Sequence, residues 1–181
     1  MDTLFFVTSN EGKIKEAKEI LGFPIEVAKL ELDEIQSLQL EDIVTHKVKQ
    51  AYEKIQKPVI VDDVGLYIED WGGFPGPFIK FLIESGGNEL LINMMKSALS
   101  RKVVAKAAIG FYNGTNLKTF IGEINGTISE EPLGDNGWGW DNVFIPEHSD
   151  KTYAQMTSEE KNQMSHRRAA LEKLREFLNT E

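Results

Sequence analysis

Cysteine is absent from the 181-residue chain. Without thiols the chain has no disulfide framework, no thiolate nucleophile and none of the cysteine-based zinc modules. This composition fits a reducing compartment, and we expect a cytoplasmic protein. Long hydrophobic runs are also lacking: the N-terminal apolar stretch 4–7 is too short for a signal peptide or a membrane span. No membrane partner is therefore expected.

Basic residues are fewer than acidic residues in this chain. The chain has 20 Lys and Arg residues against 29 Asp and Glu residues, which gives a net charge of −9. Such a chain repels nucleic acids and anionic membranes, so neither is an expected partner. A polyphosphate substrate would need a local lysine cluster and a divalent metal to overcome this field. The length fits one globular domain, residues 1–181, within which two lobes are compatible with the sequence.

The hydrophobic pattern predicts alternating strands and helices. Helical spacing of apolar residues predicts a helix around residues 14–21, a second over 40–55, a third over 89–99 and a last one around 170–178. Strands are expected at 3–7, 59–61, 103–112, 117–128 and 143–145, with hairpins at Asn113-Gly114 and Asn125-Gly126. This order predicts an α/β fold in which helices flank a mixed central sheet and functional loops follow the strands.

A polar turn between the first strand and the first helix is a candidate phosphate site. It contains Thr8, Ser9, Asn10 and Lys13, and a helix start offers free amide groups and a favourable dipole to an anion. An ordinary helix cap, formed by Ser9 or Asn10, explains the same residues equally well.

Lys47 and three carboxylates form a second candidate group. Lys47 lies on the apolar stripe of its predicted helix, where it either extends to the edge of the core or faces a phosphate. Asp62 and Asp63 follow the strand at 59–61, which we expect to end there, and alternation along a strand points them to opposite faces. With Glu34 they supply the oxygen ligands that magnesium prefers, although Asp is also common in turns after strands.

Aromatic and basic residues near the C-terminus form a third group. Trp138, Gly139, Trp140 and Asp141 lie in a glycine-rich segment where a base has room to stack, although tryptophan is more often a core residue. Hydrogen-bond donors follow in Lys161, His166 and Arg167, for which a solvated helix start is the alternative interpretation.

In this order the motifs resemble the inosine triphosphate pyrophosphatase family over nearly the whole chain. The resemblance is carried by TSNEGK with Glu16 after it, LDEIQ, Lys47, VIVDDVGL, GFPGPFIKF, GWGWD, TYAQM, EKN and SHR. It implies a two-lobed fold around a nucleotide cleft, usually in a homodimer. It also implies a magnesium-dependent hydrolysis of ITP, dITP and XTP to the monophosphate and pyrophosphate.

The resemblance also assigns roles to single residues. Phosphate binding falls to Thr8, Ser9, Asn10, Lys13 and Lys47, with the two lysines and Asp63 as catalytic groups. Metal binding falls to Glu34, Asp62 and Asp63, and Asp63 is the expected base. The remaining substrate contacts fall to Val64, Trp138, Gly139, Trp140, Asp141, Lys161, His166 and Arg167, with Trp138 stacking on the base.

Five positions depart from the family pattern. Val64 occupies a position where the family commonly has serine, and Leu133 one where it usually has arginine. Asn142 replaces a usual proline, Gln155 a usual glutamate and Arg168 a frequent glycine. The departures around Gly134 and Asp141 keep open a nonenzymatic nucleotide-binding protein. A second alternative is a nucleotide-dependent transferase that uses the same phosphate site and needs a second substrate pocket.

Overall fold

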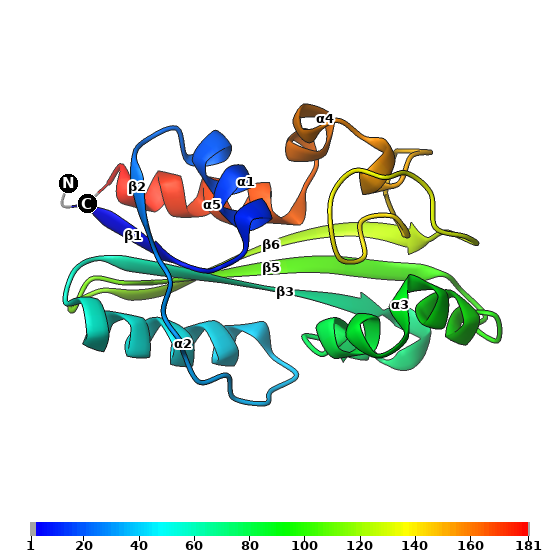
Figure 1. Ribbon diagram of the computed structural model, residues 1–181, viewed down its shortest axis with the longest axis horizontal. Helices are drawn as coiled ribbons and strands as arrows, with labels where there is room; N and C mark the ends of the chain where they lie inside the picture. The colour runs from blue at the N-terminus through cyan, green and yellow to red at the C-terminus, as the bar shows by residue number, and fades with distance from the viewer. Residues whose placement is uncertain (1–2, 181) are drawn as a thin grey trace. The chain divides into compact units, whose positions relative to one another are not determined.

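The computed structural model describes residues 3–180 (Figure 1). The helices are α1 (Glu11–Leu21), α2 (Leu40–Ile55), α3 (Ile79–Met95), α4 (Ser158–Gln163) and α5 (His166–Leu178), with short 3-10 turns at Glu69–Trp71 and Tyr153–Gln155. The strands are β1 (Leu4–Val7), β2 (Ile25–Ala28), β3 (Val59–Ile68), β4 (Pro75–Gly76), β5 (Lys102–Tyr112), β6 (Leu117–Ile128) and β7 (Phe144–Pro146). Among these described helices, none is long and apolar enough to cross a membrane.

All the strands belong to one mixed sheet, which confirms the predicted fold class. The strand order is β2-β1-β3-β5-β6-β7, and β4 pairs with β3 beside this path. β1 runs parallel to both β2 and β3, whereas β4 is antiparallel to β3 and β7 is antiparallel to β6. The chain divides into two compact units, and β3, β5 and β6 each contribute residues to both.

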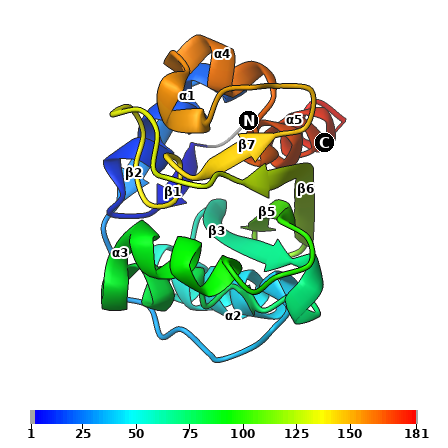
Figure 2. The same ribbon diagram turned by 90° about the vertical axis from the view of Figure 1, so that its right-hand side faces the viewer.

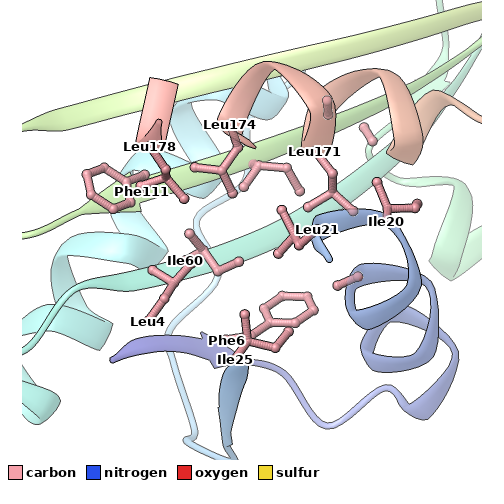
Figure 3. Close-up of a cluster of buried hydrophobic side chains, with 14 residues drawn as sticks. Leu4, Phe6, Ile20, Leu21, Ile25, Ile60, Phe111, Leu171, Leu174 and Leu178 are labelled. Carbon is pink, nitrogen blue, oxygen red and sulfur yellow. The ribbon is translucent and has the colours of Figure 1, made fainter. Parts of the chain in front are cut away.

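The first unit comprises residues up to 64, 107–122 and from 167 onward. Helices α1 and α5 lie on one side of its strands and α2 lies on the other (Figure 1). Figure 3 shows the core under α1 and α5, where Leu21, Leu171 and Leu174 point toward Ile60. Each such side chain stabilises the fold by about 1.5–3 kcal/mol when it leaves water. This core fixes the helix that follows the first strand and the last helix of the chain.

Helix α2 packs very closely on the opposite side of the same strands. Its buried residues Ile43, Val44, Val48 and Ala51 recur at helical spacing, as predicted for residues 40–55. A Cβ atom added at Gly110 of β5 would lie 2.8 Å from the carbonyl oxygen of Val44. The glycine therefore permits the close approach of α2, which holds Lys47 against β3.

The second unit comprises residues 65–106 and 123–166. Its core contains Leu66 of β3, Ile79 and Leu91 of α3, and Phe144 of β7. Figure 2 shows α3 beside β3, and β7 along β6. Between β6 and α5, Trp140, Phe144 and Tyr153 are part of this core.

Three predicted features differ in the structure, and β2, β4 and α4 were not predicted. β3 does not end at Asp62 and Asp63 but continues to Ile68, because Leu66 and Ile68 resume the buried alternation. The helix expected at 89–99 is the second part of α3, which begins at Ile79 and ends at Met95. Asn125-Gly126 lies inside β6, paired with β7, whereas Asn113-Gly114 does connect β5 with β6.

Candidate functional site

The turn after β1 is organised by hydrogen bonds of its own polar side chains. Asn10 is the N-cap of α1, and its side chain accepts a hydrogen bond from the Lys13 amide at 3.1 Å. The Asn10 amide in turn donates to Thr8 Oγ1 at 3.1 Å. The helix-cap interpretation of Asn10 is thus confirmed. It leaves the remaining amide groups at the helix start available for the phosphate role, which stays a prediction.

Lys13 extends from α1 to the buried carboxylate of Asp62. Its Nζ lies 2.7 Å from Asp62 Oδ1 and donates to the Asp62 backbone oxygen at 2.9 Å. The Lys13 side chain is only 12% exposed, and that of Asp62 is fully buried. Lys13 is therefore held in place before any ligand arrives.

Asp62 also contacts the last helix. Arg167 Nε donates to Asp62 Oδ2 at 2.7 Å, and Arg167 Nη1 forms a close ion pair with Glu16 Oε2. Burial alone would raise the pKa of the Asp62 carboxyl, but the charges of Arg167 and Lys13 outweigh it and hold the pKa well below its ordinary value. Asp62 is thus a carboxylate shared between two cations, one from α1 and one from α5.

Glu16 is a site residue whose role the sequence interpretation missed. It is 8% exposed and pairs with Arg167, for which we predicted a contact with the base. That contact stays a prediction, since the structure shows Arg167 bound to Glu16 and Asp62. A signal was present, because Glu16 lies beside Ala17 and two residues from Ile14 on the buried stripe of α1. Its partner, however, is 151 positions away in the sequence.

Lys47 is the centre of a second set of ion pairs. Its Nζ lies 2.7 Å from Glu34 Oε1 and 3.2 Å from Asp63 Oδ2, and its side chain is 13% exposed. Burial lowers the pKa of Lys47, but the charges of Asp63 and Glu34 outweigh it and raise the pKa above its ordinary value. The predicted lysine at the edge of the core is confirmed, and it faces two carboxylates.

The two aspartates of β3 have different environments, as strand alternation predicts. Asp62 faces α1 and α5 with a buried side chain, whereas Asp63 faces α2 with a side chain that is 23% exposed. Because they point to opposite sides, Asp62 and Asp63 do not combine with Glu34. Within residues 3–180 no three acidic or histidine side chains are grouped as a metal site. Glu34 and Asp63 do share a common cation, Lys47.

Val64, another predicted substrate contact, stabilises the position of Asp63. Its amide donates to Asp63 Oδ1 at 3.0 Å, and its side chain packs against the first core. This bond leaves Asp63 Oδ2 directed to Lys47. A contact of Val64 with substrate stays a prediction.

The second unit has its own polar centre, around Lys161. Lys161 Nζ lies 2.7 Å from Asp141 Oδ2, and both side chains are nearly buried. The same ammonium lies 5.6 Å from the ring centroid of Trp138 and 5.4 Å from that of Tyr153. One carboxylate and two aromatic faces therefore stabilise this charge. A solvated helix start, our alternative for Lys161, is wrong.

Side-chain hydrogen bonds from two residues help to fix the glycine-rich segment that carries Trp138. Asp141 Oδ2 accepts from the Trp138 amide at 2.9 Å, and Asn88 of α3 donates to the Gly139 carbonyl at 2.9 Å. Gly137 has a φ of 79°, and a Cβ atom added there would lie 2.2 Å from Asp141 Oδ2. Only glycine therefore permits this turn around the Asp141 carboxylate.

Trp140 and His166 are core residues of the second unit. Trp140 is 6% exposed and His166 is 2% exposed. The Trp140 ring centroid lies 5.4 Å from that of Phe144 and 5.3 Å from that of His166. The core interpretation of tryptophan is confirmed for Trp140. The solvated alternative is wrong for His166, and the contacts of both residues with substrate stay predictions.

Similarity to known proteins extends over the whole chain. A model of the Ham1 family matches residues 4–177. The dITP/XTP pyrophosphatase of Pyrococcus horikoshii is 42% identical over 178 residues, which cover 97% of this chain and 96% of that protein. The inosine triphosphate pyrophosphatase of Schizosaccharomyces pombe is 36% identical over 185 residues, 100% of this chain and 97% of that protein. A solved structure, the Staphylococcus aureus Ham1 protein, matches with a TM-score of 0.84 at 29% identity, covering 98% of this chain and 99% of that one.

Proposed function

Because the chain belongs to the Ham1 family, we propose that it hydrolyses the nonstandard purine nucleoside triphosphates dITP, ITP and XTP to monophosphate and pyrophosphate. The observation that carries this proposal is the charge arrangement of the first unit. Its ion pairs join three cations, Lys13, Lys47 and Arg167, with four anions, Glu16, Glu34, Asp62 and Asp63. The seven side chains together carry a net charge of −1. One divalent cation would turn this set into a net positive site for a triphosphate.

Magnesium is the metal we propose, held by Glu34 and Asp63. Their oxygens are hard donors, both are partly exposed, and both already lie on one cation, the Lys47 ammonium. Mg²⁺ commonly takes one or two carboxylates and completes its shell with water and substrate phosphates, so two protein ligands fit it. Bound there, it would supply charge neutralisation and a more acidic water. Asp62 is a less suitable ligand, because Lys13 and Arg167 contact both its oxygens.

In the proposed reaction, water attacks the α-phosphorus. Asp63 Oδ2 takes the proton of the water as a new P–O bond forms. The bond between the α-phosphorus and the bridging oxygen breaks, and pyrophosphate leaves with the electron pair. Lys13 and Lys47 bind phosphate oxygens and neutralise their charge, aided by Thr8, Ser9 and Asn10 at the start of α1. Lys47 is the cation that contacts Asp63, with its Nζ 3.2 Å from Asp63 Oδ2, so both side chains are already next to each other before substrate binds.

For the base we propose the polar centre of the second unit. Trp138 offers a stacking face, and Lys161 offers a donor to the 6-keto oxygen of hypoxanthine or xanthine. Adenine would place an amino group against that donor, and one mispaired buried group costs about 1–3 kcal/mol, or roughly ten- to a hundredfold. GTP shares the 6-keto oxygen, so its rejection requires a separate penalty on its 2-amino group.

The test is product analysis with purified protein and magnesium. We expect ITP, dITP and XTP to yield monophosphate and pyrophosphate, with ATP and GTP much slower. Chromatography of the nucleotide and separate assays of phosphate and pyrophosphate distinguish the outcomes. Binding without turnover would indicate a nonenzymatic nucleotide-binding protein, and a product other than pyrophosphate would indicate a transferase.

We also propose a homodimer in the cytoplasm. The homodimer rests on the resemblance to inosine triphosphate pyrophosphatases, and the location rests on the absence of cysteine. Light scattering coupled to size-exclusion chromatography measures the first, and fractionation of cells measures the second. A monomeric mass or a membrane-bound fraction would contradict these proposals.

A further inference from the structure

The segment that carries Glu34 has no core of its own. Residues 29–39 form neither helix nor strand, and none of their side chains is buried. Ile35 is 39% exposed and Leu38 is 58% exposed. Hydrophobic packing of this segment is limited to Leu30 and Leu32, which are partly buried. The side chains of residues 33–36 are all exposed, so polar contacts determine where the Glu34 carboxylate lies.

Four side chains of α2 make these contacts. Asp42 Oδ2 accepts from Ser37 Oγ at 2.8 Å, and the other three contact residues before Ser37 in the chain. Lys54 Nζ donates to the Glu31 carbonyl at 2.5 Å, and Lys47 Nζ donates to Glu34 Oε1 at 2.7 Å. Between them lies Gln50, three residues from Lys47 and four from Lys54, a spacing that places all three on one face of the helix. Lys54, Gln50 and Lys47 thus contact Glu31, Asp33 and Glu34 respectively, in the order of the segment.

Gln50 differs from the two lysines in what it recognises. Its Oε1 accepts from the Asp33 amide at 3.0 Å, and its Nε2 donates to the Asp33 carbonyl at 2.9 Å. A carboxamide is both donor and acceptor, so one side chain satisfies both backbone groups of one residue, as a neighbouring strand would. A lysine only donates, and its flexible stem follows an acceptor that moves. The pair of bonds from Gln50 therefore fixes the register of the segment.

We propose that Gln50 is a positioning residue for the proposed metal and phosphate site. By holding the backbone of Asp33, it places the adjacent Glu34 carboxylate on Lys47 and toward Asp63. A slip of one residue would put Ile35 or Asp33 in the place of Glu34. The inference rests on the proposed metal role of Glu34, but the anchoring itself is independent of that role.

Gln50→Ala tests the anchoring in the nucleotide-free protein. Alanine is a better helix former than glutamine, so the variant keeps α2 intact. Hydrogen exchange followed by NMR or mass spectrometry should show loss of protection at the Asp33 amide by about tenfold, the value of one or two net hydrogen bonds. Gln36→Ala, the same change at an exposed glutamine of the segment, is the control and should leave exchange unchanged. Unaltered exchange in Gln50→Ala would overturn the proposal.

A second measurement follows Mn²⁺, the probe for the metal, by electron paramagnetic resonance in the presence of pyrophosphate. Gln50→Ala should raise the dissociation constant of Mn²⁺ by roughly three- to tenfold, and Gln36→Ala should not. Gln50→Glu, which keeps the acceptor and loses the donor, should fall between wild type and Gln50→Ala. Glu34→Gln separates the two hypotheses. If it leaves Mn²⁺ binding unchanged, the metal proposal fails while the exchange result stands; if it weakens binding and Gln50→Ala does not, the positioning role fails.

Discussion

The two units hold their buried lysines in different ways. In the first unit Lys13 and Lys47 face carboxylates from other elements, and Arg167 joins the same set. In the second unit Lys161 faces one carboxylate and the rings of Trp138 and Tyr153. The carboxylates give the ion-pair set of the first unit a negative net charge, which a bound divalent metal would make positive. Aromatic rings stabilise the Lys161 cation without adding negative charge. The first arrangement suits a polyphosphate and the second suits a flat, uncharged base.

The largest effect is expected from Asp63→Asn. The change keeps the shape of a partly exposed side chain and removes the proposed base, so turnover of ITP should fall by about two to four orders of magnitude with little change in stability. Pyrophosphate release and a denaturant melt measure the two quantities. A variant that retains most of its activity would remove Asp63 from this role.

The neighbouring substitution, Asp62→Asn, should act mainly on stability. It leaves Lys13 and Arg167 near a neutral group, and breaking a buried ion pair costs about 3–5 kcal/mol. The free energy of unfolding in urea measures this loss. An unchanged value would show that Asp62 is not a structural partner of these cations.

The pH dependence sharpens this contrast. Because the pKa of Asp62 is lowered by folding, its contribution is full above its unfolded pKa of about 3.9 and is lost as the pH falls toward the lower folded value. The stability gap between wild type and Asp62→Asn should therefore be constant near neutrality and should close below about pH 4. Urea melts of both proteins between neutral and acidic pH would show this convergence. A gap that widens in acid would contradict the assigned direction.

In the second unit, Trp138→Ala should raise the Michaelis constant for ITP. Stacking on an aromatic side chain is worth about 1–3 kcal/mol per base in other nucleic-acid sites, so an increase of roughly tenfold is expected. Binding of pyrophosphate, which has no base, should be unaffected. An unchanged Michaelis constant would place the base elsewhere.

The smallest effect is expected from Asn88→Ala. Asn88 follows Gly87, where a φ of 68° interrupts α3, and it donates to Asn142 Oδ1 as well as to the Gly139 carbonyl. Without it, the Trp138 segment loses hydrogen bonds worth about 1 kcal/mol, and the affinity for inosine monophosphate should fall by roughly fivefold. Asn93→Ala, at an exposed position of the same helix, is the matched control. Equal affinities in the two variants would show that Asn88 does not act on this segment.

The fold was predictable from the sequence where the hydrophobic pattern was strong and local. The stripe of α2 predicted its observed bounds, 40–55. β2, at Ile25–Ala28, was missed because Glu26 interrupts its four residues, whereas β1, which is equally short, is wholly apolar. The start of α3 was missed because Gly86 and Gly87 break its pattern. The type of each element therefore followed from local sequence, while the exceptions came from short or interrupted segments.

The candidate site was predictable only in part. Lys47 and the aspartates of β3 were visible because charges interrupt an apolar pattern. Which carboxylate meets which cation was not visible, because Arg167 and Asp62 are 105 positions apart. Gln50 gave no signal in the sequence, because a glutamine on a helix is ordinary and its contacts with the Asp33 backbone appear only in the structure.

The contact between Glu16 and Arg167 has a consequence for biosynthesis. During translation Lys13, Glu16 and Asp62 emerge long before Arg167, and the apolar face of α5 that closes the first core emerges last. Until then Glu16 and Asp62 have only Lys13 as a cationic partner within this set, and the hydrophobic surface that α5 covers is exposed. We therefore expect that the first unit completes its folding only once α5 is available, so that a chain truncated before residue 167 would be a substrate for chaperones and proteases.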